Sequence, residues 1–459
     1  MTSSVPAIVV GAGISGLVCA YASRKAGVDA EVLEVSPRAG GVIASEMHDG
    51  FLLELGPQSF SGTAALRSLC TELGIANQLV EAPPHAPRYV LIGSKLRTVP
   101  LNPASILTSS LLSARTKWSM ARDAFGTSRP PEEDESIAAF VRRKVGDELL
   151  DRLVAPFVSG IYAGDPERIS LRAVFPQLHE AEKSAGSAIR GMMRAAKSRT
   201  GPREQPTLLS FRSGNETLVR VLAEKIGSRV HLGAEVLGIV VRREEGAVRF
   251  EVKFRQAGSE HVVASDRLVL ATPADVTGAL LRGVHAAFEP VLSGIEYAPV
   301  AVVALGYRRG DVGHSLEGFG FLVPRSSGLR VLGSVWNSSL FPKRAPKEHV
   351  LLTSFVGGAT DPAAAELSAG DLAALAHREV APILHIRAAP VLSNVQIYRR
   401  ALPQYNIGHQ GVVSTVRDLT ARTPGVFLAG NYFAGPSIGA CIENANEVAR
   451  NVAHFCSAA

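Results

Sequence analysis

Three glycines near the amino terminus have the spacing of a nucleotide-binding turn. An apolar run over residues 5–10 ends at Gly11, and Gly13 and Gly16 follow before a periodic segment that reaches Gly27. This order predicts a strand, a tight turn and a helix whose first free N–H groups can bind a pyrophosphate. The candidate ligand contacts in this segment are Gly11, Ala12, Gly13, Ile14, Ser15 and Gly16.

A carboxylate follows the second predicted strand. That strand covers residues 30–33 and ends at Glu34, where an acidic side chain binds ribose hydroxyls in dinucleotide-binding folds. The glycine spacing leaves both NAD and FAD open as ligands. Arg38 and the pair Gly40–Gly41 come soon after, and paired glycines would let a second loop run close along a long cofactor. This arrangement favours FAD in an extended form, with its flavin carried into another part of the protein.

Length, composition and charge indicate a globular protein with more than one domain. The chain has 459 residues, of which 46% are hydrophobic and 20% charged, and this length favours two or more domains. The formal net charge is +6 without a dense run of Lys and Arg, so we expect no nucleic-acid partner. A mildly basic surface suits an anionic membrane or a carboxylate-bearing substrate.

Cysteine usage and the chain's amino terminus bear on its compartment. Cys19, Cys70, Cys441 and Cys456 lack metal-site spacing, and so few cysteines predict no disulfide framework and a reducing compartment such as the cytoplasm. Residues 1–4 contain no Lys or Arg, which argues against a signal peptide. No apolar run reaches about 20 residues, so no bilayer-spanning helix is expected.

Strand and helix signals alternate along the chain, which is typical of an α/β fold. We expect a discontinuous Rossmann-type FAD-binding domain, a substrate-binding domain in which a sheet floors a pocket, and a mostly helical insertion. The FAD-binding domain would cover residues 1–85, 205–283 and 399–459. The substrate-binding domain would cover 86–98 and 284–398, and the helical insertion 99–204. Within the insertion, one helix is predicted over 104–125, and a later helix over 438–455 would present its start to phosphate or flavin oxygens.

Several segments together resemble the protoporphyrinogen oxidases, within the wider amine-oxidase-like flavoprotein superfamily. They occur in family order along nearly the whole chain, and SGIYAGD and PQYNIGH are the most specific. The segments are 56–60, 88–90, 95–100, 159–165, 318–324, 341–346, 355–358, 403–409, 430–432 and 435–442.

This resemblance implies FAD as cofactor and assigns further residues to two sites. Arg88 would pair with a substrate propionate, Gly160 would lie beside the tetrapyrrole, and apolar walls would sandwich its rings. The implied wall residues are Phe319, Val335 and Phe355. The implied cofactor contacts beyond the first turn are Glu34, Val35, Arg38, Gly40, Gly41, Gly56, Pro57, Gln58, Val236, Tyr398, Gly430, Asn431, Ser437, Ile438 and Gly439.

The implied activity is oxidation of a porphyrinogen to a porphyrin, a six-electron reaction in haem synthesis with O2 as acceptor and H2O2 as product. Protoporphyrinogen IX is the first expectation and coproporphyrinogen III the second. Because a flavin carries the redox chemistry, no catalytic acid, base or metal site is assigned. His409 and Tyr162 are interpreted as structural residues at turns.

Three positions depart from the family pattern. Gln58 replaces a usual Asn, Tyr398 replaces a common Trp, and Pro436 interrupts a Gly-Val pair before the last helix. Together they leave the substrate preference open.

The alternative functions for this chain are an amine oxidase or carotenoid desaturase, and a non-catalytic FAD-binding protein. Peripheral association of the insertion with the inner face of the cell membrane is a further hypothesis, and a homodimer is open beside a monomer.

Overall fold

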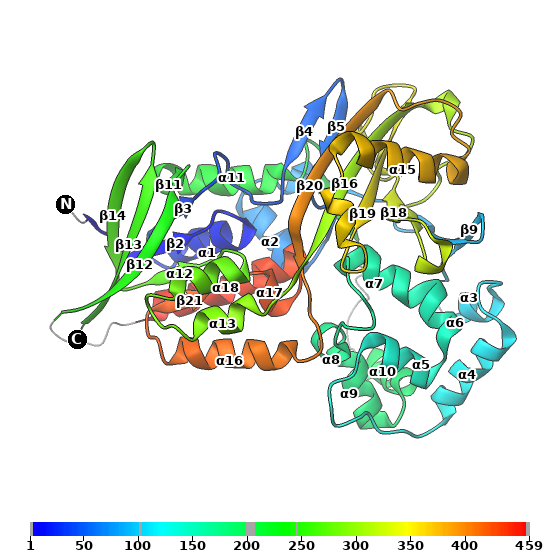
Figure 1. Cartoon of the computed structure of the whole chain (residues 1–459), viewed down its shortest axis with the longest axis horizontal. Helices are drawn as coiled ribbons and strands as arrows, with labels where there is room; N and C mark the ends of the chain where they lie inside the picture. The colour runs from blue at the N-terminus through cyan, green and yellow to red at the C-terminus, as the bar shows by residue number, and fades with distance from the viewer. Residues whose placement is uncertain (1–2, 101–102, 199–206, 245–246, 456–459) are drawn as a thin grey trace.

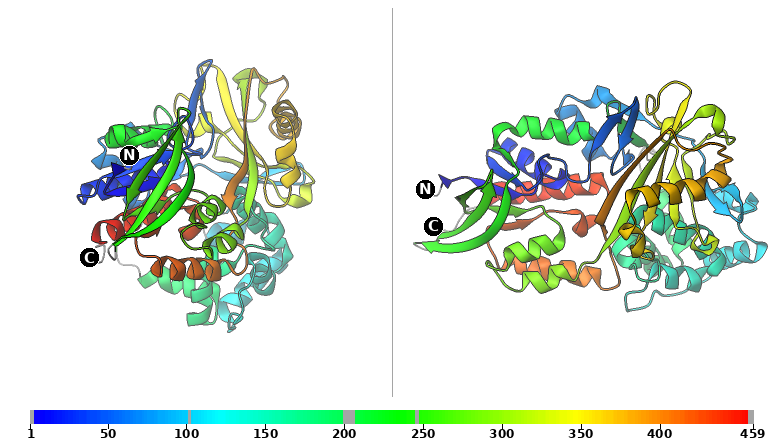
Figure 2. Two further views of the ribbon diagram at one scale, coloured as in Figure 1. Left: turned by 60° about the vertical axis from the view of Figure 1, so that its left-hand side comes forward. Right: turned by 45° about the horizontal axis from the view of Figure 1, so that its top comes forward.

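The computed structural model describes residues 3–100, 103–198, 207–244 and 247–455. Two lobes lie side by side, and a helical region packs below the second lobe (Figure 1). The long strands β16 (Tyr297–Arg308) and β20 (Leu392–Pro403) run between the lobes, as the rotated views in Figure 2 also show. Strand β20 crosses the expected boundary at residues 398/399.

The first lobe is built on a five-stranded parallel sheet. In spatial order its strands are β11 (Val230–Leu232), β3 (Ala30–Glu34), β2 (Ala7–Val10), β15 (Leu268–Leu270) and β21 (Val426–Leu428). One core joins this sheet to α1 (Ile14–Lys25), α11 (Glu216–Ile226) and α18 (Ile438–His454). A second core joins it to α12 (Ala274–Leu281), α13 (Phe288–Ser293) and α16 (His409–Ala421). Helices therefore cover both faces of a buried parallel sheet, as predicted for an α/β fold.

Smaller sheets extend this lobe. One contains β1 (Ser3–Ser4), β14 (Ser259–Ser265), β13 (Ala247–Gln256) and β12 (Glu235–Glu244). Another contains β6 (Phe60–Ser61), β10 (Leu208–Phe211) and β7 (Leu79–Glu81), and a hairpin pairs β4 (Ser45–His48) with β5 (Phe51–Glu54).

The second lobe is a seven-stranded mixed sheet. Its remaining strands, continuing from β20 and β16, are β19 (His349–Gly357), β18 (Val331–Val335), β17 (Gly320–Leu322), β8 (Arg88–Ile92) and β9 (Lys95–Thr98). Helix α15 (Ala369–Leu384) covers one face through a shared core. Because successive side chains of a strand point to opposite faces, every second side chain of this sheet lies on the face away from α15.

The helical region differs from the sequence prediction at its start. The single helix predicted over 104–125 is wrong, because α3 (Pro103–Thr108) ends before α4 (Ala114–Phe125) begins. Ser113 caps α4 by accepting a hydrogen bond from the Thr116 N–H, so this serine starts a new helix instead of continuing the old one. The other helices are α5 (Ile137–Lys144), α6 (Asp147–Leu149), α7 (Ala155–Tyr162), α8 (Leu171–Val174), α9 (Pro176–Ala185) and α10 (Ala188–Ser198).

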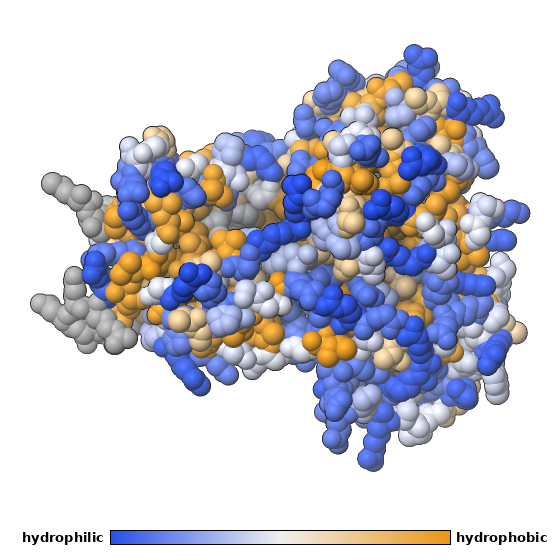
Figure 3. Space-filling model, in the orientation of Figure 1, coloured by the Kyte–Doolittle hydropathy of each residue, from blue (hydrophilic) through white to orange (hydrophobic). Residues whose placement is uncertain are grey.

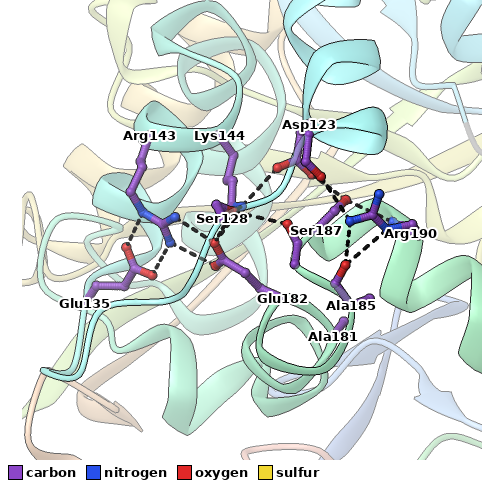
Figure 4. Close-up of polar contacts among 12 residues, drawn as sticks. Asp123, Ser128, Glu135, Arg143, Lys144, Ala181, Glu182, Ala185, Ser187 and Arg190 are labelled. Carbon is purple, nitrogen blue, oxygen red and sulfur yellow. Dashed lines mark hydrogen bonds and ion pairs between the residues drawn. The ribbon is translucent and has the colours of Figure 1, made fainter.

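A buried charge network holds this helical region together (Figure 4). Glu182 on α9 is fully buried and pairs with Lys144 at 2.6 Å and with Arg143 at 2.8 Å. Lys144 also pairs with Asp123 of α4 at 2.9 Å, and Arg143 pairs with Glu135 at 2.7 Å. These ion pairs connect α4, α5 and α9 around one carboxylate.

We expect the helical region to lose stability in acid through Glu182. Burial raises the pKa of this carboxyl, but hydrogen bonds from Arg143, Lys144 and Ser128 outweigh burial and lower the pKa to about 2. A depressed pKa in the folded state gives stability above the ordinary pKa near 4.5, and this stability is lost as pH falls toward 2. Thermal unfolding followed by circular dichroism should show this loss in the wild type, whereas Glu182→Gln should start about 1–3 kcal/mol less stable and respond less to pH in this window.

Candidate functional site

The turn between β2 and α1 has backbone geometry that requires glycine at two positions, Gly11 and Gly16. Gly11 has φ +99°, and its N–H donates to the Leu33 carbonyl at 2.8 Å. A Cβ on Gly16 would overlap the Gly11 carbonyl oxygen, whereas a Cβ on Gly13 would meet no protein atom within 4 Å. Gly13 also starts α1 without a capping side chain. The open side of Gly13 and the uncapped amides of α1 fit a pyrophosphate.

Glu34 is fixed beside this turn. Its carboxylate is buried and accepts hydrogen bonds from the Ala12 N–H at 2.6 Å and the Ser36 N–H at 2.9 Å. Each oxygen keeps a second lone pair that could accept a ribose hydroxyl. Val35 is 64% exposed next to it, and Val236 on β12 is near because the Ala234 N–H donates to the Glu34 carbonyl. These positions fit a nucleoside on this side of the turn.

Arg38 shapes the second glycine loop. Its guanidinium donates to the carbonyls of Ala39, Ile43 and Gly41 at 3.2, 3.1 and 2.5 Å. Gly40 forms a parallel bridge with Gly13 and donates its N–H to the Ala12 carbonyl. The loop therefore lies directly against the first turn, and Arg38 supports it through backbone carbonyls.

The loop at 56–58 connects the two lobes. A Cβ on Gly56 would overlap the Val42 carbonyl oxygen, so this loop packs on the segment that follows Gly41. The Gln58 amide donates to the Glu54 and Gly56 carbonyls at 2.9 and 2.8 Å, and its oxygen accepts from Asn337 at 2.7 Å. Gln58 in place of Asn thus bridges to the second lobe by its extra length.

A buried ion pair lies behind this loop. Arg344 and Glu54 are each 1% exposed and approach to 2.8 Å. Glu54 also accepts from the Ser45 hydroxyl at 2.6 Å and from the Asn215 N–H at 3.0 Å, and the Asn215 amide donates to the Pro57 carbonyl at 2.8 Å. Sequence reasoning did not identify these supporting residues, because their partners are distant in the chain.

The carboxyl-terminal segment lies next to this site. Helix α17 (Asn431–Ala434) follows Gly430, whose N–H donates to Asn444 Oδ1 at 3.2 Å. Ser437 caps α18 by accepting from the Ala440 N–H at 3.1 Å, so Pro436 precedes the cap without entering the helix. A Cβ on Gly439 would lie 2.8 Å from Thr63 Cγ2, and Ile438 beside it is buried in the α1–α18 core.

Strand register places predicted substrate residues on the sheet face away from α15. Arg88 pairs with Gly320, and Gly320 pairs with Val335. Val335 pairs with Thr353, and Phe355 lies two residues further along the same strand. Because side chains alternate along a strand, Arg88, Val335 and Phe355 share one face.

The same face extends to Tyr398. Phe355 pairs with Val302, and Tyr398 on β20 pairs with Val300. Burial raises the pKa of the Tyr398 hydroxyl, and the Arg38 charge opposes this rise. Tyr398 therefore lies where the sheet face meets the second glycine loop, close to the predicted cofactor contacts.

A small pocket surrounds Arg88. The Arg88 guanidinium lies 5.5 Å from the centre of the Phe319 ring, a cation–π distance. The pocket is lined by Ala82, Pro83, Pro84, Ala86, Arg88, Thr207, Leu208 and Phe319. A cation beside an apolar wall suits a carboxylate carried by a hydrophobic ligand.

Gly160 lies where α7 packs on this face. A Cβ at Gly160 would approach Leu322 Cδ2 to 2.5 Å, so a larger residue here would force the Leu322 side chain to move. Among residues 3–100, 103–198, 207–244 and 247–455, no group of His, Cys, Asp or Glu could hold a metal ion.

Comparison with known proteins identifies the family. The family of flavin containing amine oxidoreductases matches residues 14–453. The chloroplastic protoporphyrinogen oxidase of Nicotiana tabacum is 34% identical over 98% of this chain and 86% of the relative. The coproporphyrinogen III oxidase of Bacillus subtilis (strain 168) is 28% identical, with 95% of each chain covered.

Solved structures agree in fold. A provisionally named protoporphyrinogen oxidase from Exiguobacterium sp. 255-15 superposes with a TM-score of 0.82, 26% identity and 99% coverage of both chains. A putrescine oxidase superposes with a TM-score of 0.70, covering 98% of this chain and 99% of that one, but its 20% identity supports the fold alone. The chain therefore belongs to the flavin containing amine oxidoreductase family, is related to the protoporphyrinogen oxidases, and is an FAD-dependent oxidoreductase.

Proposed function

We propose that this protein oxidises a porphyrinogen to the corresponding porphyrin, with protoporphyrinogen IX as substrate and O2 as acceptor. The observation that carries the proposal is the shared sheet face, on which Arg88 and apolar side chains lie beside the predicted flavin contacts. A large hydrophobic tetrapyrrole with carboxylates needs this combination of apolar walls and a cation. Bound FAD would supply the redox chemistry, and six electrons passed to three O2 molecules would give three H2O2.

The names of the relatives favour a porphyrinogen over other substrates of the superfamily. Tobacco protoporphyrinogen oxidase is 34% identical and the Bacillus subtilis coproporphyrinogen III oxidase 28% identical, so coproporphyrinogen III is the second candidate. The test is porphyrin fluorescence and peroxide release under air with each porphyrinogen supplied separately, and with a panel of amines. Oxidation of amines alone would overturn the proposal, and porphyrinogen that fails to bleach the flavin under anaerobic conditions would favour a non-catalytic FAD protein.

Arg88→Ala should raise KM for protoporphyrinogen IX while changing kcat little. Loss of a charge-assisted hydrogen bond to a propionate costs about 1.5–3 kcal/mol, or roughly a 10- to 150-fold rise in KM. Arg97→Ala is the matched control, because Arg97 is an exposed arginine on the neighbouring strand β9. Steady-state kinetics of both variants would measure the effect, and an unchanged KM for Arg88→Ala would exclude the propionate contact.

We also propose peripheral contact between the helical region and the inner face of the cell membrane. Trp118 is 70% exposed and Phe125 87% exposed, seven residues apart on α4 and hence on one side of it. Met192 and Met193 on α10 are also exposed. The face shown in Figure 3 is mostly hydrophilic over the helical region, so contact would use another side. No helix within the described residues is long and apolar enough to cross a bilayer.

Co-sedimentation with anionic liposomes at low salt tests this contact, using Trp118→Ser/Phe125→Ser for comparison. Failure of the wild type to sediment would exclude it. Cytoplasmic location and the choice between monomer and homodimer stay predictions, and analytical ultracentrifugation would decide the second.

A further inference from the structure

Two side chains hold the backbone of the short segment between β21 and α18. The Tyr405 hydroxyl donates to the Asn431 carbonyl at 2.5 Å. The His409 ring nitrogen Nε2 lies 2.8 Å from the Tyr432 carbonyl. Because a carbonyl can only accept, Nε2 must carry a hydrogen. Two side chains of the PQYNIGH segment (403–409) thus bind the carbonyls of two successive residues of α17.

These two side chains also touch each other. Their ring centres are 4.9 Å apart with planes at 76°, and both residues are buried. Burial lowers the pKa of His409, which agrees with a neutral ring that donates from Nε2. The pair therefore forms one packed unit against α17.

The same unit reaches the helix that carries Gly160. Tyr405 meets the ring of Tyr162 edge-on at 6.0 Å, and Tyr162 is the last residue of α7. The Tyr405 carbonyl accepts from the Ser170 N–H at 2.9 Å. Gln404, next in the chain, donates to the Tyr162 carbonyl at 3.0 Å. Tyr405 thus contacts both the wall at α7 and the segment at Asn431.

We propose that Tyr405 and His409 are positioning residues that set the Gly430–Asn431 backbone, and with it the flavin, relative to the substrate wall at α7. The inference rests on the predicted FAD contacts of Gly430 and Asn431 and on the proposed role of Gly160. Neither side chain needs to touch the substrate for this role. Removing either hydrogen bond leaves a backbone carbonyl of this segment without its side-chain partner. The segment can then shift, and because it carries the predicted flavin contacts, the flavin environment should change even without substrate.

The test compares Tyr405→Phe with Tyr307→Phe in the FAD-loaded enzyme. Tyr307 is the matched control, because it is also buried and its hydroxyl is bonded to His377 at 3.0 Å, on the α15 side of the sheet. We expect Tyr405→Phe to shift the visible flavin spectrum and to raise the FAD dissociation constant about fivefold, with the control unchanged. A spectrum, flavin reduction potential and FAD affinity that all match the wild type would overturn the proposal.

His409 gives a second, independent measurement. His409→Gln retains an N–H that can reach the Tyr432 carbonyl, whereas His409→Ala does not. We expect the glutamine variant to restore the spectrum and FAD affinity that the alanine variant loses, and equal behaviour of the two variants would contradict the role of this hydrogen bond. These readouts need no porphyrinogen. A protein that proves inactive on porphyrinogens would therefore overturn the proposed function, whereas the flavin spectra and FAD affinities would still decide this inference.

Discussion

Gly13→Ala is expected to give a protein that folds as stably as the wild type but is purified almost colourless. The added Cβ meets no protein atom within 4 Å, and Gly13 has an ordinary negative φ of −68°, so the apoprotein has no reason to lose stability. The methyl group would instead occupy the side of the turn that faces the pyrophosphate. Overpacking of this kind costs about 1–3 kcal/mol, or roughly 5- to 150-fold in FAD affinity.

Gly16→Ala should behave differently, which makes the pair informative. Its Cβ would overlap the Gly11 carbonyl oxygen, so α1 must move away from β2. The apoprotein should therefore be less stable than the wild type, and its affinity for FAD should also be lower. Gly411→Ala in α16 is the control, because its Cβ also meets nothing within 4 Å and alanine favours a helix. Thermal unfolding of the apoproteins and titration with FAD would separate these cases. Full FAD affinity in Gly13→Ala would show that the pyrophosphate does not lie at this turn.

Sequence reasoning succeeded where the physics is local. The glycine turn depends on a few neighbouring residues, so the strand β2, the helix α1 and the end of β3 at Glu34 could be predicted from spacing alone. The prediction of one helix over 104–125 was wrong, because hydrophobic periodicity does not reveal which serine caps a helix. Ser113 ends that continuity by its own side-chain hydrogen bond.

Contacts between the lobes could not be predicted in this way. Gln58 is a predicted cofactor contact, and the structure adds that its side-chain oxygen accepts a hydrogen bond from Asn337, 279 residues away in the chain. Tyr162 and His409 were interpreted as structural residues at turns, but nothing in the sequence indicated that the Tyr405 ring packs against both of them. Such pairs depend on how strands and helices meet in space, and a single sequence contains that information only indirectly.

At pH 8, Arg344→Met is expected to cost about 3–5 kcal/mol of the free energy of unfolding, because burying Glu54 without its partner is unfavourable when the carboxyl would otherwise be charged. Glu54 and Arg344 are each 1% exposed, so water cannot replace the lost partner. Arg242→Met is the control, since Arg242 is 57% exposed, pairs with Glu251 at 3.1 Å, and should cost less than about 1 kcal/mol. Denaturant unfolding of the holoenzyme at fixed FAD concentration measures both.

The pH dependence of this variant should reveal the unpaired carboxyl. Burial raises the pKa of Glu54 to about 7, against the opposing effects of Arg344, Ser45 and Asn215, and removal of the Arg344 charge should raise it further. A folded-state pKa above the ordinary value of 4.5 means that the folded protein binds the proton more tightly, so this group's contribution to stability falls as pH rises through that window. Arg344→Met should therefore lose more stability at pH 8 than at pH 5.5, and Glu54→Gln/Arg344→Met should recover much of the loss at pH 8. An equal loss at both pH values, with no recovery in the double variant, would mean that packing of the arginine, and not its charge, holds the loop at Pro57 in place.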